Sequence, residues 1–127
     1  IIKKYKIAEG YDKKRKAKII DVEKLNKCLI NEINNFKSLS KKQINNGLII
    51  DSHLSHYLPK KYVDLCIVTK CSLKVLEKRL KKKKYNKNKI RENLDAEIFD
   101  TCLNEAEEAG HKLIVADTTN LNIVIEN

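Results

Sequence analysis

The chain has 127 residues, a length that suits one domain rather than two. Hydrophobic residues make up 42% of the chain, enough for a buried core, which excludes an intrinsically disordered polypeptide. The net charge of +10 favours an anionic partner such as nucleotide phosphates, RNA or an acidic surface, although part of the abundant lysine can be plain solvated surface. No uninterrupted apolar run is long enough to span a membrane, so we expect no membrane association.

The cysteines give no metal or disulfide signature. No pair has CxxC spacing, and the histidines do not lie near the cysteines in a zinc-ligand pattern. We therefore expect reduced thiols in a cytoplasmic protein.

The first half of the chain predicts a helix and a buried strand. Ile1–Ile7 are typical of the end of a helix that terminates near Gly10, and the charged Tyr11–Lys18 of a loop. Asp21 is a good N-cap residue for a following helix. That helix is predicted by apolar residues at helical spacing, which are Val22, Leu25, Cys28, Leu29, Ile33 and Phe36. After a polar loop, Leu48–Asp51 predict a fully buried strand that ends in a carboxylate.

The second half predicts two strands separated by helices. Val63–Val68 predict a strand, and Ser72 is a candidate cap for a short helix. A longer helix is expected over roughly Asn88–Ala109, stopping at Gly110. Leu113–Ala116 predict a third strand.

This alternation of strands and helices predicts an α/β fold with a parallel sheet. Three strands are too few for a comfortable doubly wound sheet, and the first residue is Ile1 rather than methionine. We therefore expect a further strand and helix before Ile1.

Polar residues follow each predicted strand, at the edge where ligands of open parallel sheets bind. The three clusters are Asp51–His53, Thr69–Lys70 and Asp117–Asn120. An aspartate at the end of an apolar strand can hold a magnesium ion against nucleotide phosphates. The alternative is that Asp51 only caps a following turn.

Two further features have both a chemical and a structural interpretation. His53 points with Asp51 if the strand continues, and it could then orient a water or contact a phosphate; otherwise it is a hydrogen-bonded structural histidine. The run Lys81–Lys84 could place positive charge over a transferred phosphoryl group, or be a solvated charge run. Arg79 and Arg91 flank it and could supply bidentate contacts.

Glycine is scarce. The chain has only Gly10, Gly47 and Gly110, and none belongs to a G-x-x-x-x-G-K-[ST] pattern. The backbone nest that holds a β-phosphate is therefore absent from these 127 residues.

Taken together, several segments resemble the adenylate kinase isoenzyme 6 family over nearly the whole chain. Residues 9–12 and 19–25 resemble the stretch after its monophosphate-site helix, and residues 47–56 resemble its Walker B strand and Asp-x-His motif. Its short lid and the helix after it are resembled by Val75-Leu76, Arg79-Leu80, Tyr85-Asn86, Asn93 and Ala96–Ile98.

The resemblance implies a three-layer α/β/α P-loop kinase fold with a parallel sheet, whose first strand and P-loop are missing from this chain. Residues 1–127 would form a single domain, with a monophosphate-binding segment over residues 1–20, a short lid over residues 82–92 and the remainder as core. The implied activity is phosphoryl transfer between ATP and AMP, with ATP hydrolysis and Mg²⁺. The implied cellular role is maturation of the small ribosomal subunit, through a ribosomal protein and contact with rRNA.

The resemblance also assigns roles to residues. Asp51 would coordinate the magnesium ion, His53 would be its paired functional histidine, and Lys83 would stand in place of the lid arginine. Lys3 would face the AMP phosphate, and Asn120 would lie in the loop against adenine. The predicted nucleotide-binding residues are Lys3, Arg79, Lys83, Tyr85, Arg91, Thr118, Thr119 and Asn120.

The chain departs from the family pattern in several places: its lid has Lys83-Lys84 instead of Arg-Gly, Lys70 replaces an arginine after the strand, the helix from Asp21 is followed by a longer polar connection, and the last helix is cut short. Two other readings stay open. The chain could be a non-catalytic basic module that binds a ribosomal protein or pre-rRNA, or a basic α/β domain that shares only ancestry with the family.

Overall fold

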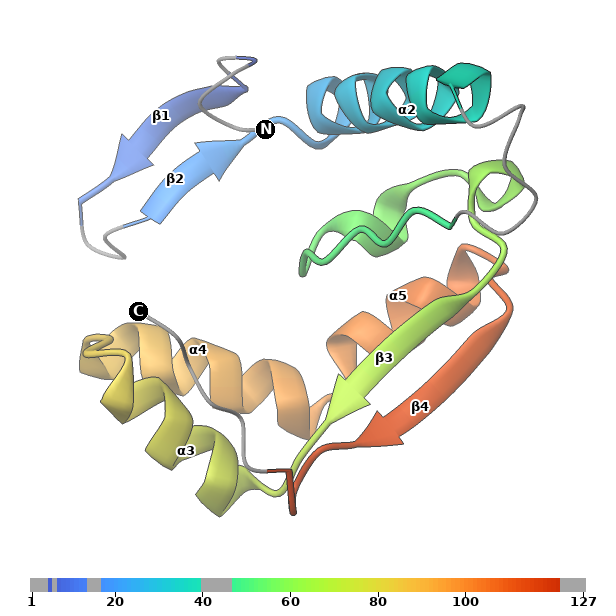
Figure 1. Ribbon diagram of the computed structural model, residues 1–127. Helices are drawn as coiled ribbons and strands as arrows, with labels where there is room; N and C mark the ends of the chain where they lie inside the picture. Colours follow the sequence, from blue (N-terminus) through green and yellow to red (C-terminus); the bar gives the residue numbers. More distant parts are fainter. Residues whose placement is uncertain (1–4, 6, 14–16, 40–46, 122–127) are drawn as a thin grey trace.

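The computed structural model describes residues 5, 7–13, 17–39 and 47–121. Within these ranges the chain forms an antiparallel hairpin, a parallel strand pair and a set of helices (Figure 1). The elements are β1 (Ala8–Asp12), β2 (Ala17–Ile20), α2 (Val22–Leu39), η2 (Ser55–Tyr57), η3 (Lys60–Tyr62), β3 (Cys66–Lys70), α3 (Leu73–Lys82), α4 (Lys87–Ile98), α5 (Thr101–Glu108) and β4 (Leu113–Asp117).

The hairpin corrects the prediction for the N-terminal segment. Gly10 does not end a helix but lies in β1, and much of the expected loop Tyr11–Lys18 pairs with itself, with Tyr11 opposite Lys18. Side chains along β1 are mostly exposed, so no apolar alternation announced the strand. Of Ile1–Ile7, only Tyr5, which is helical, and Ile7 are described.

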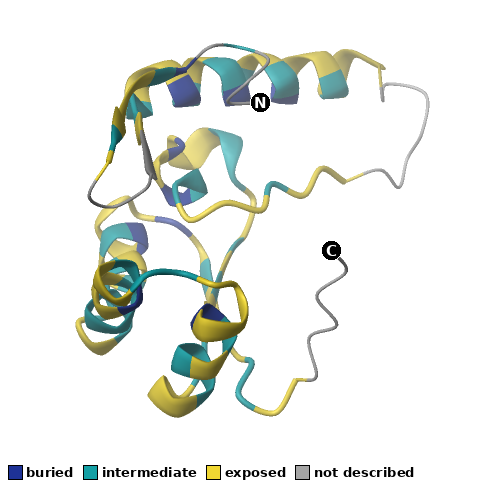
Figure 2. Cartoon of the chain, turned by 90° about the vertical axis from the view of Figure 1, so that its left-hand side faces the viewer, coloured by how far each residue is buried: buried dark blue, intermediate teal, exposed yellow. Residues whose placement is uncertain are grey.

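Helix α2 forms as predicted and provides the main core. The backbone N–H of Lys24 donates to Asp21 Oδ1 at 3.1 Å, which caps the helix and lowers the pKa of that carboxyl. Apolar residues three or four positions apart line one side of α2, visible as its buried stripe in Figure 2. The core cluster consists of Leu25, Leu29 and Ile33 from α2, with Ile7 and Leu58.

The predicted strand Leu48–Asp51 is wrong. These residues belong to no strand ladder of the described chain, and the Ile49 side chain is 92% exposed. A strand exists only where a neighbouring strand satisfies its backbone groups, and an apolar run cannot reveal whether that neighbour is there. The segment instead runs into η2, where His56 and the following Leu58 are buried.

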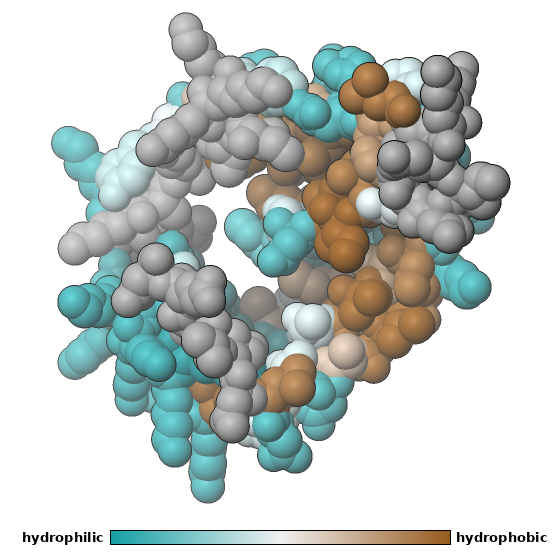
Figure 3. All heavy atoms as spheres, viewed as in Figure 1, coloured by the Kyte–Doolittle hydropathy of each residue, from teal (hydrophilic) through white to brown (hydrophobic). Residues whose placement is uncertain are grey.

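Strands β3 and β4 confirm the parallel pairing that the sequence predicts. Cys66 pairs with Leu113 and Lys70 with Asp117, so both strands end level with each other. The strand expected over Val63–Val68 begins three residues later than predicted. Helix α5 packs against β3, whereas Ile67 and Ile114 remain about half exposed, and hydrophobic residues gather on that side of the molecule in Figure 3.

The long helix predicted over Asn88–Ala109 is two helices, α4 and α5. The break lies at Phe99 and Asp100, and Asp100 has a left-handed backbone with φ of 52°. Its carboxylate forms an ion pair with Lys70 at the end of β3, a long-range contact that the helical pattern could not show. Gly110 ends α5 as predicted, with φ of 73°.

No helix among the described residues is both long enough and apolar enough to cross a bilayer.

We predict that Leu29→Ala lowers the free energy of unfolding by about 2–5 kcal/mol, because Leu29 is only 2% exposed and removing its side chain leaves a cavity in the core. Leu39→Ala on the same helix is the control, because Leu39 is 85% exposed and the change should stay within about 0.5 kcal/mol. Urea unfolding measures both values. Equal effects of the two substitutions would contradict this core.

Candidate functional site

The carboxyl ends of β3 and β4 are joined through one carbonyl. Both the backbone N–H and the hydroxyl of Thr118 donate to the carbonyl oxygen of Lys70, at 2.7 and 2.9 Å. The loop that follows β4 is thereby held at the edge where open parallel sheets bind ligands.

A second set of bonds shapes the same loop. The backbone N–H of Thr119 donates to Asp117 Oδ1 at 2.8 Å, and the Thr119 hydroxyl accepts from the backbone N–H of Ser72 at 3.0 Å. The Thr119 hydroxyl, and then its amide, hold the pKa of the exposed Asp117 below its ordinary value. Ser72 occupies the N-cap position of α3, but its side chain makes no cap bond there. Asn120 lies at the exposed turn of the loop.

Arg79 lies against this loop. Its Nη1 donates to the Thr118 hydroxyl at 3.1 Å, and its Nη2 donates to the carbonyl oxygens of Thr118 at 2.7 Å and Leu121 at 3.0 Å. The sequence predicted that Arg79 contacts a phosphate, but in the structure its guanidinium donates its hydrogen bonds to Thr118 and Leu121.

The predicted lid is a tight turn between α3 and α4. Lys83 is exposed at the C-cap of α3, and Lys84 has a left-handed φ of 57° at the place where the family pattern has glycine. The Tyr85 ring lies 4.1 Å from Lys89 Nζ, and the guanidinium of Arg91 pairs with Asp95 at 2.9 Å on the surface. Lys83, Lys84 and Arg91 are exposed to solvent, and Tyr85 and Lys89 are partly exposed.

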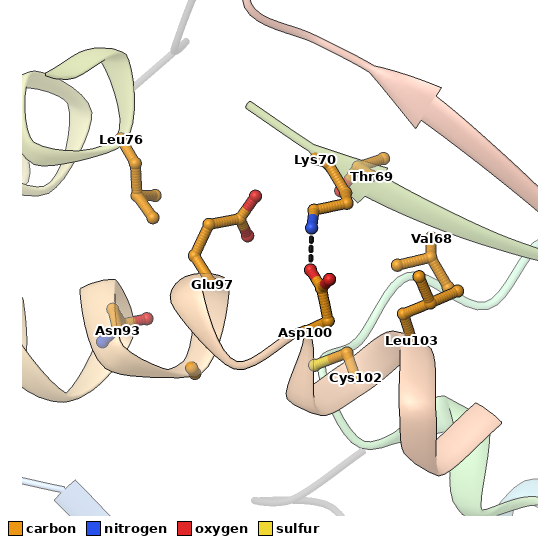
Figure 4. Close-up of a pocket in the computed structure, with 10 residues that line it drawn as sticks. Val68, Thr69, Lys70, Leu76, Asn93, Glu97, Asp100, Cys102 and Leu103 are labelled. Carbon is orange, nitrogen blue, oxygen red and sulfur yellow. Dashed lines mark hydrogen bonds and ion pairs between the residues drawn. The ribbon is translucent and has the colours of Figure 1, made fainter. Parts of the chain in front are cut away.

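A small cavity of about 150 Å³ lies between the end of β3 and helices α3 to α5. Figure 4 shows the ion pair of Lys70 with Asp100 inside it. Beside it, the Glu97 carboxylate accepts from the backbone N–H of Cys71 at 3.2 Å. Ligand pockets usually measure about 300–1,000 Å³, so this cavity is too small for a nucleotide. Its polar side chains Lys70, Glu97 and Asp100 instead form a junction that connects the end of β3 to the break between α4 and α5.

The residues of this junction were not among the predicted site residues. Glu97 lies in the last turn of α4, Asp100 lies three positions later at the break before α5, and Lys70 comes from the distant β3. Acidic residues at that spacing were the available signal, but they are common on exposed helix faces.

Asp51 and His53 lie on a separate exposed segment. Residues 47–52 are not a strand and the chain turns at His53, so the two side chains do not share a strand face. The Ser52 hydroxyl accepts from the backbone N–H of Leu54 at 3.1 Å, which shapes the turn. Lys3, the predicted monophosphate contact, lies outside the described residues.

Two buried histidines anchor this segment. His56 Nε2 lies 2.8 Å from Glu105 Oε2 on α5, and His111 Nε2 donates to the carbonyl oxygen of His56 at 2.7 Å. Neither histidine was among the predicted site residues. Their contacts tie the chain that follows Asp51 to the helix and strand of the second half.

The described residues contain no group of three or more His, Cys, Asp or Glu side chains that could hold a metal ion. A single exposed carboxylate such as Asp51 still fits magnesium, because Mg²⁺ retains several waters and binds one or two carboxylates together with substrate phosphates.

We predict that Thr119→Val raises the pKa of Asp117 toward 3.8, because the substitution removes the hydroxyl that stabilises the carboxylate. A depressed pKa means that Asp117 stabilises the fold above pH 3.8 and that this contribution is lost as the pH falls through its folded pKa. The acid-sensitive part of stability should therefore shrink in the variant.

Carboxyl NMR titration measures this pKa. Thr69→Val is the control, because it makes the same change at an exposed position of β3 and should leave the Asp117 titration unchanged. An unaltered Asp117 pKa in Thr119→Val would show that the hydroxyl does not have this role.

Comparison with known proteins identifies relatives of the chain. A family model described as an AAA domain matches residues 1–100. A protein of Methanocaldococcus jannaschii named "Putative adenylate kinase" is 35% identical over 122 residues, which cover 96% of this chain and 60% of that protein.

Two eukaryotic proteins are also similar. The "Adenylate kinase isoenzyme 6 homolog" of Dictyostelium discoideum is 30% identical over 91% of this chain and 61% of its own length. The "Adenylate kinase isoenzyme 6 homolog FAP7" of Saccharomyces cerevisiae is 34% identical over 86% of this chain and 50% of its own length. The chain thus spans about half to three fifths of the length of these relatives.

Proposed function

Because the chain belongs to the adenylate kinase isoenzyme 6 family of P-loop kinases, we propose that the protein transfers a phosphoryl group between ATP and AMP and also hydrolyses ATP. The observation that supports this most is the similarity to adenylate kinase relatives along 96% of the chain. The level strand ends of β3 and β4, with a bonded loop beyond them, are compatible with nucleotide binding at that edge.

In this proposal Asp51, His53 and Lys83 each have a different role in phosphoryl transfer. Asp51 holds Mg²⁺ through its exposed carboxylate, and the ion neutralises charge on the phosphates when it is bound. His53 orients the attacking group or a water, and Lys83 brings positive charge from the α3–α4 turn.

The nucleotide contacts divide in the same way. The segment of residues 1–20, with Lys3, binds the monophosphate, and the lid of residues 82–92, with Tyr85 and Arg91, covers the triphosphate. The loop containing Thr118, Thr119 and Asn120 faces the base. No residue of the chain is assigned the role of the phosphate-cradling glycine loop, because its three glycines form no such pattern.

We predict that Asp51→Asn in the native protein lowers the rate of phosphoryl transfer at least about 100-fold, because loss of a metal-ion contact removes several kcal/mol of charge stabilisation. ADP formation from ATP and AMP with varied Mg²⁺ measures the rate. Because Asp51 is exposed, the unfolding temperature should hardly change.

Asp64→Asn is the matched control for this experiment. Asp64 is an exposed aspartate between η3 and β3, outside every predicted contact to nucleotide, so the variant should retain full activity. Full activity of Asp51→Asn would end the assignment of Asp51 as the magnesium-binding residue.

We also propose that the protein acts in maturation of the small ribosomal subunit, where it contacts a ribosomal protein and rRNA. Exposed lysines support the rRNA contact: they gather along α3 and the turn after it, and Figure 3 shows hydrophilic residues in that region. They are Lys74, Lys78, Lys81, Lys82, Lys83, Lys84 and Lys87, and Lys81 is paired with Glu77 at 2.6 Å. A cytoplasmic location stays a prediction from the sequence.

We predict that affinity for a single-stranded RNA falls with rising salt, with a slope of about 0.7 in log–log form for each phosphate that is neutralised. The double variant Lys82→Gln/Lys84→Gln should reduce this slope, whereas Lys27→Gln/Lys37→Gln on the exposed side of α2 should not. Fluorescence anisotropy at several salt concentrations measures the slope. A flat response of the unaltered chain would exclude the RNA contact.

RNA binding that persists while the native protein shows no turnover would favour the non-catalytic basic module over the kinase.

A further inference from the structure

We propose that Arg79 is a positioning residue for base recognition: it fixes the loop Thr118–Leu121 in one shape and does not bind phosphate. This inference rests on the proposed function, in which that loop faces the base of the nucleotide.

The geometry of the guanidinium is the first argument. Its two terminal nitrogens make three hydrogen bonds, to the Thr118 hydroxyl and to the carbonyl oxygens of Thr118 and Leu121. These acceptors lie three positions apart in the chain, so one planar fork spans the whole turn. A lysine amine, a single point on a flexible stem, could not reproduce that span.

The guanidinium of Arg79 is already occupied by hydrogen bonds to the loop. A bidentate phosphate contact needs two N–H groups that point the same way, and both terminal nitrogens of Arg79 already donate to the loop. Binding a phosphate would break these bonds and expose carbonyl groups that have lost their donors, which costs free energy. Arg79 is partly buried, which strengthens this preference.

The rest of the loop depends on the same fork. Bonds to Lys70 and Ser72 hold Thr118 and Thr119, but they reach only the first half of the loop. Leu121 at its far end is held by Arg79 and by its own N–H, which donates to the Thr118 carbonyl. Without Arg79, Thr118 and Thr119 would keep their bonds to Lys70 and Ser72, whereas the Leu121 carbonyl would lose its side-chain donor.

A fixed turn matters for recognising a base. Adenine and guanine differ in which edge positions donate and accept hydrogen bonds, so a loop discriminates between them only if its own donors and acceptors keep their places. In this loop the carbonyls of Thr118 and Leu121 are occupied, which leaves the exposed Asn120 and the neighbouring backbone to meet a ligand.

Arg79 also connects this loop to the lid. It lies on α3 four residues before Lys83, whose backbone N–H donates to the Arg79 carbonyl oxygen at 3.1 Å. Helix α3 therefore both ends at the predicted lid and, through Arg79, holds the loop Thr118–Leu121.

The test compares Arg79→Lys, which keeps the charge, with Arg79→Gln, which does not. Lys27→Gln is the control, because it removes a positive charge from an exposed position of α2, outside every proposed nucleotide and RNA contact. ATP and GTP affinities of the native protein are measured by calorimetry, and amide hydrogen exchange of residues 118–121 is followed without nucleotide.

We expect both Arg79 variants to bind ATP about tenfold more weakly, to lose most of the preference for ATP over GTP, and to exchange the loop amides faster. Lys27→Gln should match the unaltered protein in all three. Should Arg79→Gln fail to fold, Thr118→Val removes the Nη1 contact from the loop side and should give the same pattern more weakly.

The alternative outcomes separate the two proposals. Restored affinity in Arg79→Lys would show that the charge acts on phosphate and would overturn the inference. Faster exchange with unchanged base preference would reduce Arg79 to a structural role and overturn it as well. If the unaltered native protein binds neither nucleotide, the proposed kinase function fails, and the role of Arg79 in base recognition fails with it.

Discussion

The parallel pairing of β3 and β4, closed at its carboxyl end by Thr118, is the constraint on which the rest of the candidate site depends. Because Lys70 pairs with Asp117, both strands stop at one level, and the Lys70 carbonyl can accept two bonds from Thr118. Parallel strands must be joined by a long crossover, here α3 to α5, and each of these helices returns a side chain to that edge. They are Arg79 from α3, Glu97 from α4 and Asp100 at the N-cap of α5.

The crossover helices are placed by polar contacts as much as by apolar packing. Leu80 and Ile90 are buried on α3 and α4, and these two helices pack together. The ion pair of Lys70 with Asp100 lies where α4 ends and α5 begins, at a residue whose backbone is left-handed. A non-glycine residue in that conformation costs about 1–2 kcal/mol, and the carboxylate of this residue is the partner of Lys70.

The segment that holds Asp51 and His53 belongs to a different neighbourhood. Its following turn packs Leu58 under α2, and the buried His56 and His111 tie it to α5 and β4. The segment is thus anchored just after the two proposed phosphate residues, while those residues themselves are exposed. Exposed carboxylate and imidazole groups that are backed by a packed turn are suited to a ligand that brings its own charge and its own metal ion.

Much of the fold was predictable because it follows from short-range patterns. The N-cap at Asp21, the apolar spacing of α2, the two parallel strands and the stop at Gly110 are local features with direct physical causes. The family also follows from the linear sequence, because a family model matches residues 1–100 and a relative is 35% identical over 122 residues.

Tertiary structure alone decided the rest. The break at Asp100 and the absence of a strand over Leu48–Asp51 depend on whether a distant segment supplies a partner, which no local pattern records. The hairpin pairs adjacent segments, but the mostly exposed side chains of β1 show no apolar alternation that would predict it. The same holds for Arg79: its sequence position beside a lysine run suggested a phosphate, whereas the folded chain brings the Thr118–Leu121 loop, about forty residues away, against its guanidinium. A hydrogen-bonding group can be named from the sequence, but what it bonds is settled by which acceptors the fold brings within its reach.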